Sequence, residues 1–206
     1  MKLILVCGPW SSGTTAVSGV INFLGVKSIA PFFTTNDNKT KNTYESKLFR
    51  KLMLSLASEK EIKRIKDKKY IDEAIKEFKI NVKNLAIFPE NEEKILFLKH
   101  PLASLFVKEL ASNFELYLIY VLRPMKDIEK TRARRNWSSE FGVKGAQVIY
   151  SNMFNTLINE NFPTLMIKYK NLIENPLVVI KQIVKFTSIK PSDDQIKQAS
   201  AFIKVD

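Results

Sequence analysis

Four short apolar runs alternate with helical patterns along the chain. Runs of this length, bounded by glycine, proline or charged residues, are typical of strands buried on both faces. Apolar residues at helical spacing follow the first run, and prolines at 101, 124 and 176 open the helical patterns after the others. This alternation predicts an α/β fold of three layers, in which helices cover both faces of a parallel sheet. The runs lie at residues 3–7, 94–98, 116–122 and 164–167.

A long segment, residues 31–93, separates the first helix from the second strand. It opens with a polar loop at 34–43 and then becomes helical. We expect this helical insertion to cover an active site, within a single domain that spans residues 1–206. Three helices are predicted in it, one with Leu48, Leu52 and Leu56 on a shared face, one begun by a capping box of Ser58 and Glu61, and one with Ile71, Ile75 and Phe78 on its buried face.

Composition and charge narrow the class of protein. Hydrophobic residues make up 45% of the chain and charged residues 26%, which is typical of a globular protein. The net charge of +12 favours an anionic partner: nucleic acid, a membrane surface or a small polyanion. The Lys-rich stretch at 60–69 alternates with acidic residues, so we expect a solvated helix face there and no stable nucleic-acid partner.

The first apolar run is too short for a signal peptide, and no window is long enough to span a membrane. The single cysteine, Cys7, fits a reducing compartment. These features predict a cytoplasmic protein without a membrane span.

The first strand leads into a glycine-bearing loop with the spacing of a P-loop, residues 8–15. In such a loop the backbone N–H groups, the helix N-terminus and the hydroxyls point at an anion, so we predict a phosphate site at Ser11, Ser12, Gly13, Thr14 and Thr15. Thr14 stands where nucleotide-hydrolysing loops carry lysine, and no strand end is acidic enough to hold magnesium. An ATPase or kinase is therefore disfavoured, and no metal is predicted. The purely structural alternative is a turn that only packs the helix on the strand.

Arg123 stands at the carboxyl end of the third predicted strand, where ligands of open α/β sheets bind. Thr131 follows about two helical turns later and can face the same crevice. A forked guanidinium and a hydroxyl together suit a phosphate group. Three further arginines lie in the same helix, at 132, 134 and 135, and we interpret at least two of them as solvated.

The two motifs together resemble the sulfotransferases that use 3′-phosphoadenosine 5′-phosphosulfate (PAPS). The resemblance rests on Ser12-Gly13-Thr14-Thr15 after the first strand and on Arg123-Pro124-x-x-Asp127-x-x-x-Thr131 after a later one. It implies that Ser11 to Thr15 cradle the 5′-phosphosulfate and that Arg123 and Thr131 bind the 3′-phosphate. Tyr169 lies in a segment, 167–176, that resembles the family's Tyr-Glu-Asp-Leu stretch, which implies a place in the cofactor site.

Catalytic residues are implied by the same resemblance. The family usually has a basic residue where this chain has Ser11, and Lys99 is a candidate to replace that cation. His100 lies in a segment similar to the family's Lys-Thr-Pro or Lys-Thr-His, which makes it a candidate base. Glu45, in an Asn-x-Tyr-Glu region similar to one that faces the acceptor in bacterial members, is the competing base. The structural alternatives are a helix cap for His100 and a first-turn glutamate, favourable to the helix dipole, for Glu45.

The expected activity is the transfer of a sulfuryl group from PAPS to a hydroxyl or amine of a small-molecule or carbohydrate acceptor, without a metal. Two alternatives remain open on the residues alone. One is a P-loop nucleotide kinase with an atypical loop, and the other is a non-catalytic module that binds a nucleotide or nucleic acid.

Overall fold

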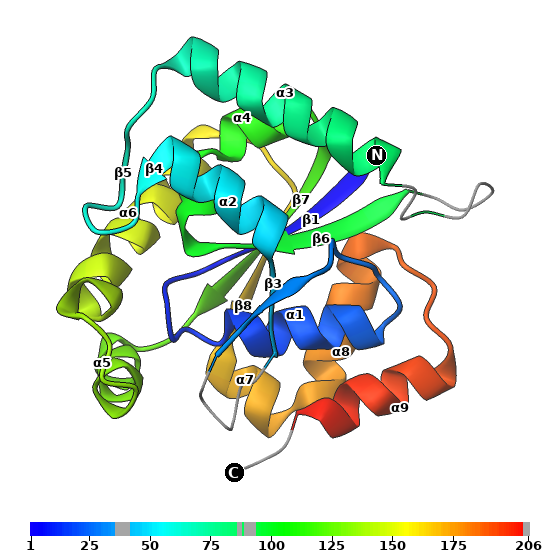
Figure 1. The fold of residues 1–206 in the computed structure, drawn as a ribbon. Coiled ribbons are helices and arrows are strands. Elements are labelled where there is room, and N and C mark those ends of the chain that lie inside the picture. Colours follow the sequence, from blue (N-terminus) through cyan, green and yellow to red (C-terminus); the bar gives the residue numbers. More distant parts are fainter. Residues whose placement is uncertain (36–41, 86–87, 89–93, 204–206) are drawn as a thin grey trace.

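The structure, a computed structural model, describes residues 1–35, 42–85, 88 and 94–203. Its middle layer is a parallel sheet of four strands in the order β6-β1-β7-β8 (Figure 1). Because all neighbours pair in parallel, the carboxyl ends of the strands meet at one edge of the sheet. The four predicted strands are confirmed, with bounds of β1 (Lys2–Cys7), β6 (Ile95–Lys99), β7 (Glu115–Leu122) and β8 (Thr164–Lys168).

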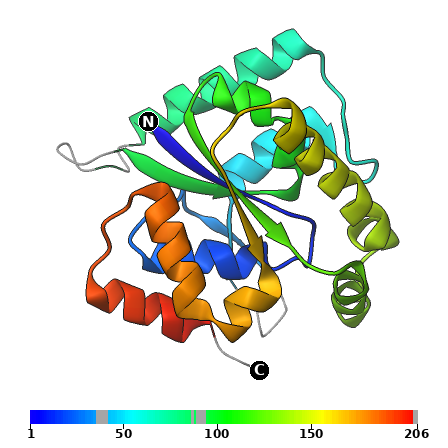
Figure 2. The same ribbon diagram turned by 180° about the vertical axis from the view of Figure 1, so that it is seen from behind.

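Helices cover both faces of this sheet, which confirms the predicted three-layer α/β fold (Figures 1 and 2). In β1, Leu3 and Leu5 point into one core and Ile4 and Val6 into the other, so the strand is apolar from Leu3 to Cys7. One face packs against α1 (Thr14–Phe23), α8 (Pro176–Thr187) and α9 (Asp193–Phe202). The other packs against α2 (Lys47–Leu56), α3 (Lys68–Asn84), α4 (Val107–Ala111) and α6 (Val143–Asn159).

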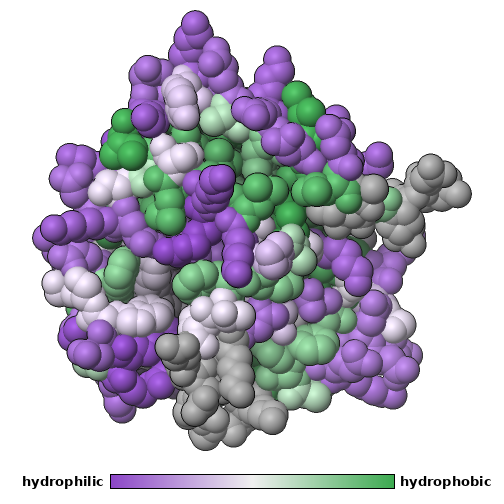
Figure 3. Space-filling model, viewed as in Figure 1, coloured by the Kyte–Doolittle hydropathy of each residue, from purple (hydrophilic) through white to green (hydrophobic). Residues whose placement is uncertain are grey.

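The connections at the carboxyl edge are short helices. The pattern after Pro101 forms a 3-10 turn, η1 (Pro101–Leu105), before α4, and α7 (Tyr169–Glu174) follows β8 directly. Helix α5 (Met125–Arg134) buries only Ile128 and projects from the side of the molecule. Hydrophilic side chains cover it, as they cover the outer end of α3 (Figure 3). A second 3-10 turn, η2 (Ser139–Phe141), leads into α6; the helices α6, α7 and α9 are not among the predicted elements.

The insertion differs in part from its prediction. Residues predicted as a loop form the ends of a hairpin of β2 (Phe32–Thr34) and β3 (Asn42–Ser46), and residues 36–41 lie outside the described residues. The prediction of a helix begun by a capping box is wrong. The Ser58 Oγ accepts from the Glu61 N–H at 3.2 Å, but this bond closes a turn between β4 (Ala57–Ser58) and β5 (Lys63–Arg64). A local side-chain bond of this kind caps a turn as readily as a helix.

Two predicted helices of the insertion are present. Helix α3 buries Ile71, Ile75 and Phe78 as predicted. Helix α2 buries Phe49 and Met53 together with Leu56, so its deepest face is rotated from the predicted one. Both helices pack into the core, and it is strand β3, beside α1 and β6, that brings the insertion to the carboxyl edge of the sheet. None of the helices in the described ranges is long and apolar enough to cross a membrane.

Candidate active site

The loop between β1 and α1 depends on two glycines. Ser11 and Gly13 have φ angles of 64° and 100°, in the left-handed region that glycine adopts without strain. A Cβ on Gly13 would lie 2.1 Å from the ring of Tyr169, and one on Gly8 would lie 2.6 Å from Oγ of Ser12. Gly13 is therefore required by close approach and by its backbone conformation, and Gly8 by close approach alone.

The loop leaves polar groups without partners. Ser12 is fully buried, yet neither its Oγ nor that of Ser11 has a hydrogen-bond partner within the described residues. Helix α1 begins after Gly13, with Thr14 buried and Thr15 half-buried in its first turn, and no side chain caps it. Buried hydroxyls and an uncapped helix N-terminus are an arrangement that binds an anion.

Arg123 reaches this loop from the end of β7. Its Nη1 donates to the backbone oxygen of Ser11 at 2.8 Å, and its guanidinium lies over the ring of Tyr169, 4.7 Å from the centroid. That ring in turn covers Gly13. Within the described part of the chain Arg123 has no acidic partner, so its positive charge is not neutralised locally.

The backbone of Arg123 is held by Tyr150 of α6. The Tyr150 hydroxyl accepts from the Arg123 N–H at 2.8 Å and donates to the Arg123 carbonyl oxygen at 3.0 Å. Burial raises the pKa of Tyr150, so the hydroxyl stays protonated and both bonds persist at neutral pH. No sequence motif marks this tyrosine, which follows Arg123 by 27 residues.

Thr131 does not join this assembly. Its Oγ1 donates to the carbonyl oxygen of Asp127, one turn earlier in α5, at 2.9 Å. Among the described contacts none links Thr131 to Arg123. The structure thus brings together Ser11, Gly13, Arg123 and Tyr169, while Thr131 stays on its own helix.

The three predicted catalytic residues form one buried cluster at the end of β6. Lys99 pairs in register with Val6 of β1, just before the loop. Its Nζ lies 3.1 Å from Oε2 of Glu45, while Nε2 of His100 lies 3.6 Å from Oε1. Oε1 of Glu45 also forms an ion pair with Arg50 of α2, at 3.0 Å. No sequence motif marks this arginine. Arg50 also pairs with Glu59, at 3.1 Å.

Burial and charge set the protonation of this cluster. Burial alone would raise the pKa of Glu45, but Lys99, His100 and Arg50 outweigh it and lower the pKa to about 2. Burial lowers the pKa of His100 to about 4, so its ring is neutral at pH 7. Because Nδ1 accepts from the N–H of Leu102, at 3.2 Å, the neutral ring carries its proton on Nε2.

The structural alternatives for the two candidate bases have different outcomes. The bond from Leu102 makes His100 the N-cap of η1, as the helix-cap interpretation predicts. Glu45 lies in strand β3 and not in a first helical turn, so the helix-dipole interpretation is wrong. In the described ranges no group of three or more His, Cys, Asp or Glu side chains is arranged to hold a metal ion.

No family model matches the sequence, and no curated protein sequence matches it. Several solved structures match this chain in fold. Sulfotransferase STF1 from Mycobacterium tuberculosis superposes with a TM-score of 0.63 at 16% identity, over 97% of this chain and 70% of that one. The sulfotransferase domain of the Synechococcus PCC 7002 olefin synthase gives 0.59 at 15% identity, over 94% and 75%. Retinol dehydratase, in complex with androsterone and the inactive cofactor PAP, gives 0.50 at 14% identity, over 99% and 65%. At these identities the comparison shows the fold, and this chain has the sulfotransferase fold.

Proposed function

We propose that this protein, which has the sulfotransferase fold, transfers a sulfuryl group from PAPS to a hydroxyl or amine acceptor. The observation that carries the proposal is the assembly of Arg123 and Tyr169 over a loop with two unpartnered serine hydroxyls. The solved structure of retinol dehydratase, which shares this fold, contains PAP, the nucleotide that remains after transfer.

The residues of the loop take the 5′ end of the nucleotide. The hydroxyls of Ser11 and Ser12 and the first-turn N–H groups of α1, at Thr14 and Thr15, donate to the phosphosulfate. Arg123 forks onto the 3′-phosphate with the N–H groups that Ser11 does not use, and Tyr169 packs against the nucleotide. Thr131 joins them by turning its hydroxyl away from Asp127.

Transfer needs in-line geometry more than covalent chemistry from the protein. The acceptor oxygen or nitrogen forms a bond to sulfur while the bond from sulfur to the phosphate oxygen breaks, and the electron pair leaves with the 5′-phosphate of PAP. Lys99, at the strand end beside the loop, exchanges Glu45 for this phosphate and stabilises its charge. The acceptor proton passes to a base of the same cluster.

Two groups compete for the role of base, and each has to release a partner. Glu45 is anionic, but both of its oxygens are in ion pairs. His100 is neutral, but its free pair on Nδ1 accepts from Leu102. When Lys99 moves to the phosphate, Oε2 of Glu45 loses its cation and its basicity rises, so we favour Glu45. The acceptor, a small molecule or a carbohydrate, then approaches along β3.

Calorimetry with PAP and with adenosine 5′-phosphate tests the nucleotide assignment. In Arg123→Ala, PAP binding is expected to weaken by about 100-fold, since a forked charged bond to phosphate is lost, while adenosine 5′-phosphate loses less than about threefold. Arg134→Ala, an exposed arginine of α5, is the matched control. Equal losses for the two nucleotides would remove the 3′-phosphate assignment, and PAP binding without turnover of PAPS would leave a binding module.

A further inference from the structure

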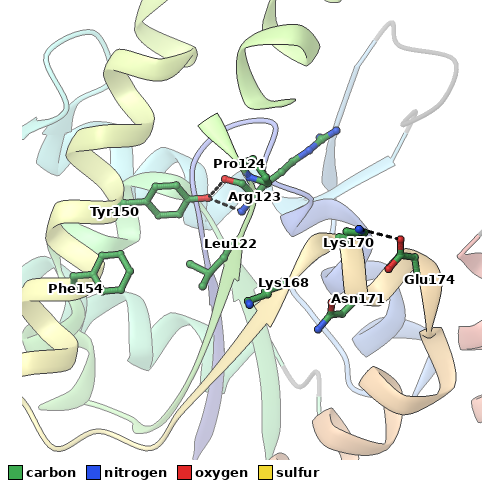
Figure 4. A pocket seen from close by; sticks show the side chains of 9 residues that line it. All are labelled: Leu122, Arg123, Pro124, Tyr150, Phe154, Lys168, Lys170, Asn171 and Glu174. Carbon is green, nitrogen blue, oxygen red and sulfur yellow. Dashed lines mark hydrogen bonds and ion pairs between the residues drawn. The ribbon is translucent and has the colours of Figure 1, made fainter. Parts of the chain in front are cut away.

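A cavity of about 600 Å³ opens between α6 and α7, at the carboxyl ends of β7 and β8 (Figure 4). Its wall includes Leu122 of β7, the rings of Tyr150 and Phe154 of α6, Lys168 of β8 and Lys170 of α7. This volume lies within the range of about 300–1,000 Å³ of small-molecule sites. None of the loop residues 11–15 lines it.

The cavity adjoins the nucleotide site without being part of it. Arg123 lines its rim, but in Figure 4 the arginine side chain extends away from Leu122 and Lys168. Tyr150 also lines the cavity, and its hydroxyl is hydrogen-bonded to both the N–H and the carbonyl oxygen of Arg123. The tyrosine therefore presents its ring to the cavity and has no polar group left for a ligand there.

The wall is apolar on one side because the free edge of the sheet extends beyond its covering helix. Leu165 and Ile167 of β8 pack into the core beneath α8, so Met166 and Lys168 point to the opposite face, where Met166 is 50% exposed. On α6, Phe154 lines the cavity and is 45% exposed. The apolar surface of Phe154 and Met166 that remains exposed here could be buried by a ligand.

The charged side of the cavity carries two lysines, Lys168 and Lys170, and one glutamate, Glu174. Lys168 is exposed and has no ion-pair partner within the described residues. Lys170 pairs with Glu174 at 3.5 Å, but both side chains are more than half exposed, so this pair holds the ammonium only weakly. Two ammonium groups opposite an apolar wall complement a molecule with one anionic end and one apolar body.

We propose that this cavity is a second ligand site, which binds an amphipathic organic anion. The apolar body lies against Leu122 and Phe154, and the head group lies between Lys168 and Lys170. The cavity shares Arg123 with the nucleotide site proposed above, but Leu122, Phe154 and the two lysines do not belong to the loop assembly.

Calorimetric titration of the whole chain with decanoate tests the site. Acetate has the head group without the chain, and decyltrimethylammonium has the chain with the opposite charge. Decanoate is expected to bind at least about tenfold more tightly than either, because only it satisfies both sides of the cavity. Equal binding of decyltrimethylammonium would overturn the proposal, since it would show an apolar surface without selection for charge.

Matched variants locate the binding. Phe154→Ser and Lys168→Glu are each expected to weaken decanoate at least about tenfold. The controls are Ile158→Ser, one turn further along α6 and 77% exposed, and Lys181→Glu on α8, neither of which lines the cavity. All four positions are on the surface, so the variants should fold. Equal losses in variants and controls would mean adsorption without a site.

The nucleotide separates the two proposals. Phe154→Ser and Lys168→Glu are expected to leave PAP binding unchanged; a loss would make the cavity part of the nucleotide site and overturn its independence. Conversely, equal losses of PAP and adenosine 5′-phosphate in Arg123→Ala would remove the nucleotide assignment, while the decanoate titration would still test the cavity.

Discussion

The loop of residues 8–15 and the cluster around Glu45 lie at neighbouring strand ends, yet they satisfy their polar groups in opposite ways. In the loop, two buried serine hydroxyls and the N-terminus of α1 have no side-chain partner in the described part of the chain. In the cluster, Glu45 is bound by Lys99 and Arg50, and Arg50 is shared with Glu59. The loop has hydroxyl donors without an acceptor among the described residues, whereas the cluster contains its own carboxylate, Glu45.

This difference separates the roles of the two regions. An unpartnered buried hydroxyl costs about 1–3 kcal/mol, and under the proposed function a bound phosphate offsets this cost. In the cluster, the ion pairs of Glu45 fix where Lys99 stands, and Nε2 of His100 is the atom that has no hydrogen-bond partner among the described residues. Replacing a residue of the cluster should therefore lower the free energy of unfolding, while replacing a residue of the loop should weaken nucleotide binding.

The largest expected effect comes from Glu45→Ala. It leaves Lys99, only 6% exposed, without a carboxylate, and breaking a buried pair in this way costs about 3–5 kcal/mol. Urea denaturation measures the loss in the free energy of unfolding. Glu59→Ala removes the more exposed partner of Arg50 and should cost less than about 1 kcal/mol. Similar costs for the two variants would show that charge does not hold the cluster together.

Ser12→Ala should separate stability from binding. Removing a buried hydroxyl without a partner should leave the free energy of unfolding unchanged or raise it by about 1 kcal/mol, while PAP affinity falls about tenfold. Ser18, in the same helix region, is the matched control, because its Oγ is also buried without a described partner but does not belong to the loop. Ser18→Ala should therefore match the change in stability and keep the affinity; a loss of affinity in both variants would point to a general loosening of α1.

The last expected effect concerns pH. The folded pKa of His100, about 4, lies below its ordinary value of 6.5, so as pH falls from about 6.5 to about 4 the unfolded chain takes up a proton that the folded chain refuses. Stability should therefore decline across this window. Glu45, with a pKa of about 2 against 4.5, should continue the decline at lower pH.

His100→Asn should flatten the decline between pH 6.5 and 4 relative to the wild type, measured as the free energy of unfolding at several pH values. Glu45→Gln should change mainly the region below about pH 4.5. An unchanged slope in His100→Asn would mean that the imidazole is accessible to protons in the folded state.

Parts of the fold and of the site could be predicted because their signals are local. An apolar run such as Leu3 to Cys7 is buried on both faces wherever it lies in a parallel sheet, and Gly13 marks a turn that other residues adopt with strain. The same locality misled at Ser58, whose bond to the Glu61 N–H is present but closes a turn. Local bonds are predictable, whereas the element that they serve depends on its neighbours.

The sequence by itself determined the four strands, the loop that leaves the first of them, and the place of Arg123 at a strand end. Only the tertiary structure decided that Arg123 lies over Tyr169, that Tyr150 holds its backbone, and that Glu45 reaches Lys99 from a strand. The physical reason is the range of the interactions. Strand and turn preferences act between residues a few positions apart, but ion pairs and ring contacts form between segments that only the packing of the sheet brings together.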